Sequence, residues 1–418
     1  MATTWLLQAG ETFTTFTFLG TAGLVVSGGA AAFYSMPYVP LGYLVLYFIG
    51  PKIWRMAKAR GHLTQADFLE HSYSSHTLGV IVQLVTGNRT TGVWSMVIAF
   101  ILVVAFVLWS GLRGVATTAY FKDALMLVML FVVCISIPIH FTGGFTNVFD
   151  TVAATMPDLL SVHGTEEYGI PWYISNMAIS AIGVAFVTLP HMWPPILAAR
   201  SSAVLRQNYM WLPIYNTFIV LPLIVGYVAV VILGRNTDAD SALLHLSGQM
   251  FPDWVIGVLA VARITTAMVP SAALLIGSST LASRNVFRIR SERHQFTATQ
   301  IIVVVATALS LLLAIVMPDL LANLLLLTFS GLDQLAPAIA AALFFRGRLS
   351  VRSIIAGLSA GLIVVIVYTF WLPLPWAISE GIIGLGVNVL VVAVCEGVRA
   401  GVGRSKAETS TEPIGQRA

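Results

Sequence analysis

The stretch that decides the fold is QAGETFTTFTFLGTAGLVVSGG, residues 8–29. It is apolar enough to enter a membrane, yet Glu11 lies near its start and four threonines crowd the next two turns. Four glycines then lower its helix propensity. In lipid, loosened backbone is tolerated only where it is buried in protein or lines a cavity. The stretch therefore predicts a discontinuous helix that binds a small solute or an ion near the bilayer midplane. The alternative is an ordinary packed helix whose threonines bond to their own turn.

The composition of the whole chain is that of a membrane protein. Of its 418 residues, 57% are hydrophobic and 10% are charged, whereas about a quarter of the residues of soluble domains are charged. Mean hydropathy is +0.87. We predict an all-α, polytopic membrane helix bundle whose partners are the lipid bilayer and a small molecule. The net charge of +4 does not indicate nucleic-acid binding, because the basic residues lie in short loops between apolar runs. The sequence leaves the oligomeric state open.

Catalytic motifs and cofactor motifs are missing from the sequence. It contains no HExxH pattern, and its one GxSxG match, residues 357–361, lies inside an apolar run, so we predict that the protein is not an enzyme. Cys134 and Cys395 both lie in apolar runs and indicate neither a disulfide framework nor a metal motif. We expect no cofactor beyond a coupling ion, either Na⁺ or H⁺.

Eleven segments are long enough to cross about 30 Å of hydrocarbon. Together they predict a transmembrane domain over residues 1–397, followed by a polar and disordered cytoplasmic tail over 398–418. Loops rich in Lys and Arg alternate with loops that are poor in them, such as 143–171 and 235–253, so the basic loops are predicted to be cytoplasmic. This orientation places both termini in the cytoplasm and the protein in the inner (plasma) membrane. The predicted spans are 5–32, 36–54, 93–112, 119–141, 172–197, 209–234, 254–283, 299–317, 319–345, 351–371 and 376–397.

One pair of basic loops breaks the alternation. The cluster in 51–62 is separated from Arg113 by a single predicted span, 93–112, so the two cannot both be cytoplasmic unless the chain crosses again within 63–92. The apolar piece there, Leu78–Val85, is too short to span the membrane. Either this piece crosses with help, or the 51–62 loop is outside, or a helix has been deleted, and we favour the deletion. Residues 62–73 before it predict a short amphipathic helix with Thr64 as N-cap and a solvated face.

Three other predicted spans contain polar or helix-breaking residues. In GVAFVTLPHMWPP, residues 183–195, three prolines break the helix beside His191 and Trp193, although a capped kink and an interfacial tryptophan are the plainer interpretations. The hydroxyl groups of 254–283 could bind a hard cation or could serve helix packing, and we favour packing. Asp333, inside 319–345, is a functional candidate because an acid within a span is costly, and Arg263 is its conceivable partner.

Several blocks, in the right order, resemble the sodium:solute symporter family. They are TFLGTAG with YSMPYVPLGYLVLYFIGPKIWRMAKARGHLTQADFLEHSY, then SGLRGVATTAYFKDALML, LPHMWPPILAARSSAVLRQNYMWLPIYN, VPSAALLIGSSTLASRNVF and LDQLAPAIAAALFF. The second and fourth blocks are closest to the branch that includes bacterial monocarboxylate permeases. The resemblance implies an inverted-repeat fold with five-plus-five core helices and transport by alternating access. It implies a cation:solute symporter for a small organic solute, with a monocarboxylate as the candidate.

The resemblance also carries over site residues. The sodium site of the family maps to backbone carbonyls of Gly10 and Phe13 and to a hydroxyl pair of which only Ser271 is present here, so proton coupling through Glu11, Asp333 or His191 is a live alternative. By this resemblance, the sequence lacks the extra helix that usually precedes the opening stretch and most of the third core helix, whose front is Leu78–Val85. A non-transporting membrane module or a degenerate symporter is therefore the rival interpretation. Implied substrate contacts are Thr14, Thr15, Thr17, Gly20, His191, Trp193 and Gln334.

Overall fold

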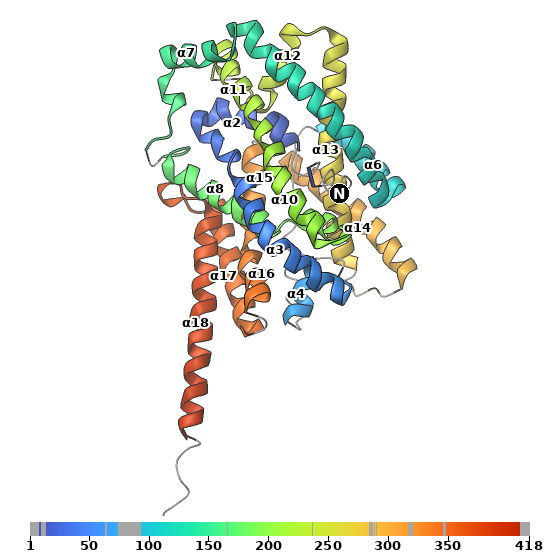
Figure 1. The fold of residues 1–418 in the computed structure, drawn as a ribbon, viewed down its shortest axis with the longest axis vertical. Helices are drawn as coiled ribbons and strands as arrows, with labels where there is room; N and C mark the ends of the chain where they lie inside the picture. The colour runs from blue at the N-terminus through green and yellow to red at the C-terminus, as the bar shows by residue number, and fades with distance from the viewer. Residues whose placement is uncertain are drawn as a thin grey trace, which may run out of the picture.

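The computed structural model describes residues 8–9, 14–62, 65–73, 93–164, 166–235, 237–283, 287, 289, 291–316, 321–345 and 348–409. Every element within these residues is a helix, which confirms the predicted all-α class (Figure 1). Nine helical segments of the described chain are long and apolar enough to cross a membrane. They are Thr21–Arg60, Thr118–Thr142, Ile170–Ala198, Ser202–Leu233, Asp253–Leu281, His294–Leu312, Asn323–Phe344, Val351–Phe370 and Glu380–Ala400.

A short π-helix, Phe16–Gly20, comes first and continues directly into α2 (Thr21–Gly28). Gly29, with φ of +55°, ends α2 and begins a 3₁₀ turn over Gly29–Ser35, and this turn delivers the chain to α3 (Tyr38–Arg60). Gly61 closes α3 in the left-handed conformation with its N–H bonded to the carbonyl of Ala57. The 40-residue run Thr21–Arg60 therefore covers the last part of the span predicted over 5–32 and all of the span predicted over 36–54.

The predicted spans 93–112 and 119–141 are not separate: they form one helix, α6 (Val93–Thr142). Glycines flank Arg113, but a glycine costs a helix only about 1 kcal/mol, and the one proline inside α6 is Pro138. Fifty residues rise about 75 Å, and the candidate span Thr118–Thr142 forms the second half of this helix. Leu78–Val85 itself lies outside the described residues.

The remaining helices form the rest of the bundle, with α17 and α18 packed side by side at one edge. Figure 1 shows α18 extending well beyond the other helices. It continues to Thr409, and 410–418 lie outside the described part. The α-helices are α4 (Gln65–Tyr73), α7 (Phe145–Thr155), α8 (Ile170–Ala185), α9 (Trp193–Ala198), α10 (Ser202–Asn216), α11 (Val220–Leu233), α12 (Ala242–Met250), α13 (Asp253–Leu281), α14 (Glu292–Val316), α15 (Leu321–Leu332), α16 (Ala336–Phe344), α17 (Val351–Phe370) and α18 (Glu380–Thr409). The short 3₁₀ turns are η3 (Pro157–Leu160), η4 (Pro190–Met192), η5 (Thr217–Ile219), η6 (Ala239–Ser241), η8 (Asp333–Leu335) and η9 (Pro375–Ala377).

The two classes of loop lie at opposite ends of the bundle. At one end, a Cβ at Gly29 would meet the backbone of Leu159 at 2.7 Å, and Arg235 lies 3.7 Å from Asp158, so the loops poor in basic residues pack together. At the other end, the indole of Trp54 donates to the carbonyl of Ala199 at 2.9 Å. The Lys52 ammonium lies 4.9 Å from the centroid of the Phe344 ring, close to the next basic loop. The predicted grouping of the loops is thus present, while the assignment of one end to the cytoplasm stays a prediction.

Candidate functional site

The first interruption lies where the opening stretch predicts it. Residues 16–20 form a π-helix rather than an α-helix, and such bulges within helices occur frequently at functional sites. The backbone N–H of Thr14 donates to the Thr17 hydroxyl at 3.4 Å, and the Thr21 hydroxyl donates to the carbonyl of Thr17 at 2.8 Å. The Thr15 hydroxyl is buried and has no hydrogen-bond partner among the described residues. Thr17 and Gly20 are buried, and Thr14 and Thr15 are half-buried.

The second interruption separates α8 from α9. Helix α8 ends at Ala185, and η4 begins at Pro190. Between them Val187 has φ of +54°, a conformation that β-branched residues very rarely adopt and that costs of order 1–3 kcal/mol. The prolines of 183–195 explain why the helix stops, because each removes a backbone donor. The predicted break is therefore present, and its centre lies just before the prolines.

Side chains from elsewhere hold the second interruption in place. Gln65 of α4 donates from Nε2 to the carbonyls of Val187 (3.4 Å) and Thr188 (3.2 Å). The indole of Trp193, which is fully buried, donates to the same carbonyl of Val187 at 2.7 Å. Trp193 thus supports the break instead of lying in an interfacial belt. Phe68 of α4 packs against Trp193 and is itself fully buried, so the predicted amphipathic helix docks on the bundle through its apolar face.

Asp333 ties the second interruption to a third irregular element. It begins the 3₁₀ turn η8 that separates α15 from α16, and it is completely buried. The hydroxyl of Thr188 donates to its Oδ1 at 2.5 Å, while Oδ2 has no hydrogen-bond partner in the described structure. A Cβ at Gly183 would lie 2.7 Å from the same Oδ1, so α8 packs against Asp333 too closely to admit a side chain at this position. Arg263, which the sequence suggested as a partner, is exposed on α13.

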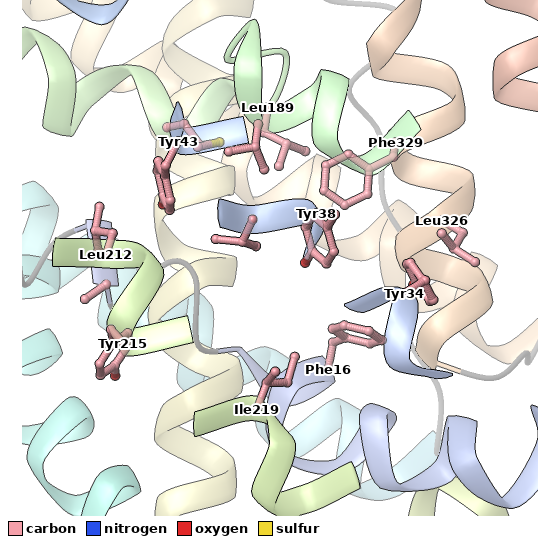
Figure 2. Packing of buried hydrophobic residues seen from close by; sticks show 14 of the residues in the cluster. Phe16, Tyr34, Tyr38, Tyr43, Leu189, Leu212, Tyr215, Ile219, Leu326 and Phe329 are labelled. Atoms are coloured by element: carbon pink, nitrogen blue, oxygen red, sulfur yellow. The ribbon is translucent and has the colours of Figure 1, made fainter. Parts of the chain in front are cut away.

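Aromatic side chains fill the space between the interruptions. Tyr38 of α3 packs edge-on against Phe329 of α15, with ring centroids 5.9 Å apart, and stacks with Tyr34 at 6.1 Å. Figure 2 shows Phe16, Tyr34, Tyr38 and Phe329 pointing toward one another from three separate parts of the chain. The first break, the start of α3 and α15 therefore converge on one buried aromatic cluster.

Gln334 and His191 are buried, but they lie in different surroundings. Gln334 donates to the carbonyls of Ser330 and Gly381, both at 3.1 Å, and accepts from Asn388 of α18. Its side chain thus faces α18 rather than the aromatic cluster. His191 lies in η4, where Nδ1 has no hydrogen-bond partner among the described residues. Roles for both in binding a substrate stay predictions.

Comparison with known proteins identifies the family. Residues 81–361, well over half of the chain, match the profile of the "Sodium:solute symporter family". The chain belongs to this family. The symporter is 30% identical to the "Uncharacterized symporter YodF" of Bacillus subtilis (strain 168), with 93% of this chain and 84% of the relative covered. It is 27% identical to the "Monocarboxylate transport permease protein" of Rhizobium johnstonii, with 94% and 87% covered.

A solved structure agrees on the fold. A Na⁺-coupled sialic acid symporter, in a substrate-bound outward-open state, superposes with a TM-score of 0.73 at 14% identity, covering 94% of this chain and 89% of the other. At that identity the likeness shows the fold alone. Together these findings establish a multi-pass membrane protein of a family of cation-coupled solute transporters with the inverted-repeat fold.

The residues that the family resemblance assigned to a sodium site are only partly described. Gly10, Glu11 and Phe13 lie outside the described residues. On α13 of the symporter, Ser271 donates back to the carbonyl of Ala267 at 2.8 Å. This leaves its oxygen lone pairs free to bind a cation, whereas Pro270 beside it offers no side-chain oxygen. Other hydroxyl groups of α13, at Thr265, Thr266, Ser278 and Ser279, also bond to their own turn, as packing residues do.

Several polar residues whose contacts the structure shows were not predicted from the sequence. Thr188 and Gln65 carry no motif, and only the fold reveals their partners. Lys122 and Asp123 did offer a signal, because two adjacent opposite charges stand inside the apolar run 119–141. In the symporter they are buried, with Lys122 Nζ 3.0 Å from Asp123 Oδ1.

Proposed function

We propose that this symporter carries a small monocarboxylate by alternating access, driven by a gradient of Na⁺ or H⁺. The observation that carries the proposal is the meeting of two interrupted spans with η8 around one buried aromatic cluster. In secondary transporters, such interruptions present unpaired backbone groups near the midplane. The relative named as a monocarboxylate transport permease supports the choice of solute.

The first interruption offers suitable chemistry for a carboxylate. Exposed N–H groups at the start of a helix carry a partial positive charge that favours an anion. Thr14 and Thr15 stand one turn before α2, and the buried Thr15 hydroxyl is free to donate to a solute oxygen. The apolar end of a small carboxylate would then contact Phe16 and Tyr38, which lie in the same cluster.

For its orientation, we propose that the end carrying Lys52 and Arg206 faces the cytoplasm of the cell and that the inner membrane holds the bundle. Both termini would then be cytoplasmic. The grouping of basic loops at one end supports this orientation.

The test is uptake of radiolabelled pyruvate by proteoliposomes under an imposed Na⁺ gradient, an imposed H⁺ gradient, or neither. We expect accumulation with one of the two gradients and only slow equilibration without them. If Na⁺ drives uptake, Ser271→Ala should weaken the dependence on Na⁺, while the matched variant Ser278→Ala, another back-bonded serine of α13, should not. Uptake that ignores both gradients contradicts the proposal.

One observation favours the rival interpretation, a membrane module that does not transport. Helix α6 is continuous where the family resemblance calls for two core helices. A core with one helix fewer would be unable to complete the inverted repeat. The uptake experiment separates the two functions, since a non-transporting module leaves the proteoliposomes indistinguishable from protein-free liposomes.

A further inference from the structure

Asp333 of η8 is a buried acid that the proposed solute site does not use. Its side chain is 0% exposed, and the hydroxyl of Thr188 donates to Oδ1 at 2.5 Å, beside the backbone of Gly183. Its Oδ2 has no hydrogen-bond partner among the described residues. The carboxyl group is therefore buried with one side-chain donor on one oxygen and none on the other.

No charged side chain among the described residues forms an ion pair with Asp333. Helices α8, α15, α16, α17 and α18 pack against η8, and α15 and α16 carry no charged or titratable group. The hydroxyl groups of Tyr34 and Tyr38 in the aromatic cluster are uncharged near neutral pH. His191, three positions after Thr188, is buried and is the rival titratable group. The titratable groups among the described side chains of α8, α17 and α18 are exposed or half-buried, and they are Tyr173, Arg352, Tyr368, Glu380, Cys395, Glu396 and Arg399.

The contacts of Thr188 suit Asp333 both with and without a proton. A hydroxyl carries one hydrogen, and that of Thr188 has two acceptors within reach: Oδ1 of Asp333 at 2.5 Å and the carbonyl of Gly183 at 3.3 Å. When Asp333 is ionised, the hydroxyl donates to Oδ1. When Oδ1 carries a proton, the carboxyl group donates to the Thr188 oxygen, and the hydroxyl turns to Gly183. Each state of the acid thus has a hydrogen-bond partner without any movement of the backbone.

Contacts of α15 place Asp333 beside the proposed solute site. A Cβ at Gly183 would lie 2.5 Å from the Phe329 ring and 2.7 Å from Asp333 Oδ1, so the two side chains flank the same point of α8. The Phe329 ring packs against Tyr38 in the aromatic cluster, which also contains Phe16 of the first interruption (Figure 2). Helix α15 itself packs against the π-helix of that interruption. The acid therefore lies one helical turn from an aromatic ring of the proposed solute site.

These surroundings make the charge of Asp333 sensitive to a bound anion. A buried carboxylate with few donors tends to be neutralised, because the apolar interior disfavours its charge. A solute carboxylate bound nearby adds a second negative charge, and like charges repel strongly where water is excluded. Ionisable groups within membrane spans commonly form part of proton relays. Binding of an anionic solute therefore favours the protonated form of Asp333.

We propose that Asp333 is the site at which this symporter binds its coupling proton together with a carboxylate solute. This inference rests on the proposed function and assigns H⁺ as the coupling ion. As the solute binds, a proton from water forms an O–H bond on the Asp333 carboxylate, and the Thr188 hydroxyl turns to Gly183. One anion and one proton enter together, so the charge of the site does not change. Release on the other side reverses both steps.

Binding of the solute and binding of the proton are reciprocal in this mechanism. Protonation of Asp333 strengthens solute binding by the same factor by which the solute strengthens proton binding. The affinity for the solute should therefore depend on pH through this one acid.

The experiment measures pyruvate binding and proton uptake on the purified full chain in weakly buffered detergent, with a pH-indicator dye. At a pH where Asp333 of the free protein is ionised, the wild type should take up about one proton for each pyruvate bound, and its affinity should fall about tenfold for each further pH unit. Asp333→Asn, which resembles the protonated acid, should bind pyruvate without proton uptake and with an affinity that does not change with pH. Asp150→Asn, the same change at an exposed position of α7, is the matched control and should behave as the wild type does.

A second variant tests the hydrogen bond and keeps the test decisive if Asp333→Asn fails to fold. Thr188→Val removes the donor to the ionised acid and keeps the shape of the side chain, so Asp333 should hold its proton to a higher pH. The pH at which pyruvate affinity begins to fall should rise by about one unit. A Thr188 that only supports the backbone would leave that pH unchanged, and this result would contradict the assignment.

Other results overturn the inference while the proposed function stands. They are pyruvate binding by the wild type without proton uptake, and either proton-linked binding or no binding by a folded Asp333→Asn. Proton uptake that is lost from His191→Gln and kept by Asp333→Asn would assign the proton to His191 instead. A wild type that neither binds nor accumulates a monocarboxylate overturns both the inference and the proposed function.

Discussion

At the first interruption, residues 14–20, the hydrogen bonds described run between threonines of the same span. At the second, residues 186–189, Gln65 of α4 and Trp193 donate to the backbone, and Asp333 of η8 accepts from Thr188. Both breaks face the same problem, since a membrane supplies no water for unpaired backbone groups. At the first break the Thr15 hydroxyl has no hydrogen-bond partner among the described residues, whereas at the second the polar side chains named above hold the backbone in place.

The difference separates two tasks. The second break is held rigid by side chains of distant elements. Its position therefore depends on the positions of α4 and η8. A break held by its own threonines keeps donors available for a solute. Changes at the second break should therefore reduce stability, and changes at the first should reduce solute affinity while leaving stability nearly unchanged. The predictions below test this division.

The largest effect on stability should follow Asp333→Ala. Asp333 is fully buried and accepts from Thr188, so its removal loses a hydrogen bond and leaves a cavity. We expect a loss of about 3 kcal/mol in the free energy of unfolding, measured by thermal unfolding in detergent. Asp333→Asn keeps an acceptor oxygen and should lose less. Equal stability of Asp333→Ala and the wild type would show that this link does not hold the break.

A smaller loss should follow Gln65→Leu. The change leaves the carbonyl of Thr188 without the Gln65 donor and removes one of two donors from Val187. A buried acceptor without a partner costs about 1–3 kcal/mol, and we expect a loss within that range in the same unfolding assay. Gln207→Leu, at an exposed position of α10, is the control and should be nearly neutral. If both variants unfold alike, α4 does not support the break.

A still smaller effect, with a pH signature, is expected at Tyr73 of α4. Its hydroxyl donates to the carbonyl of Ala338 at 2.6 Å, and Tyr73→Phe should lose about 1 kcal/mol. Burial raises the pKa of Tyr73 above its ordinary value. The stabilisation is therefore complete below the unfolded-state pKa of about 10 and is lost as the pH rises from there through the higher folded-state pKa. Unfolding curves at rising alkaline pH should fall less steeply for Tyr73→Phe than for the wild type.

The smallest change in stability should come from Thr15→Val at the first break. Because its hydroxyl bonds to no described residue, we expect a change of under about 0.5 kcal/mol. The KM for pyruvate should nevertheless rise about tenfold, as the loss of one hydrogen bond to a charged group implies. Thr265→Val, a half-buried threonine of α13, is the control for both measurements. A destabilised Thr15→Val with an unchanged KM would reverse the proposed division of tasks.

Much of the fold could be predicted from the sequence, because hydropathy and helix-breaking residues act locally. The apolar runs located most spans, and the glycines and threonines of 8–29 and the prolines of 183–195 located both interruptions. Local signals failed at Arg113, where a charge and two glycines resemble a loop but the helix continues. They failed again for Trp193, because its indole is buried against a carbonyl six residues earlier in the chain.

The site was harder to predict because its contacts join distant segments. Gln65 and Val187 are 122 positions apart, and Thr188 and Asp333 are 145 apart. A single sequence shows that Asp333 is an acid in a span, but it does not show which neighbour binds it. For the same reason the sequence predicted an amphipathic helix within 62–73 but did not show which part of the bundle its apolar face contacts.

The most direct test of the account is protection of the first interruption by solute. In a background with Cys134 and Cys395 replaced by Ala, Thr15→Cys would be labelled with a small maleimide in the presence and absence of pyruvate. Pyruvate should slow labelling at Thr15→Cys and leave Thr265→Cys unaffected. Labelling of Thr15→Cys at the same rate with and without a saturating monocarboxylate would contradict a solute site at the first broken span.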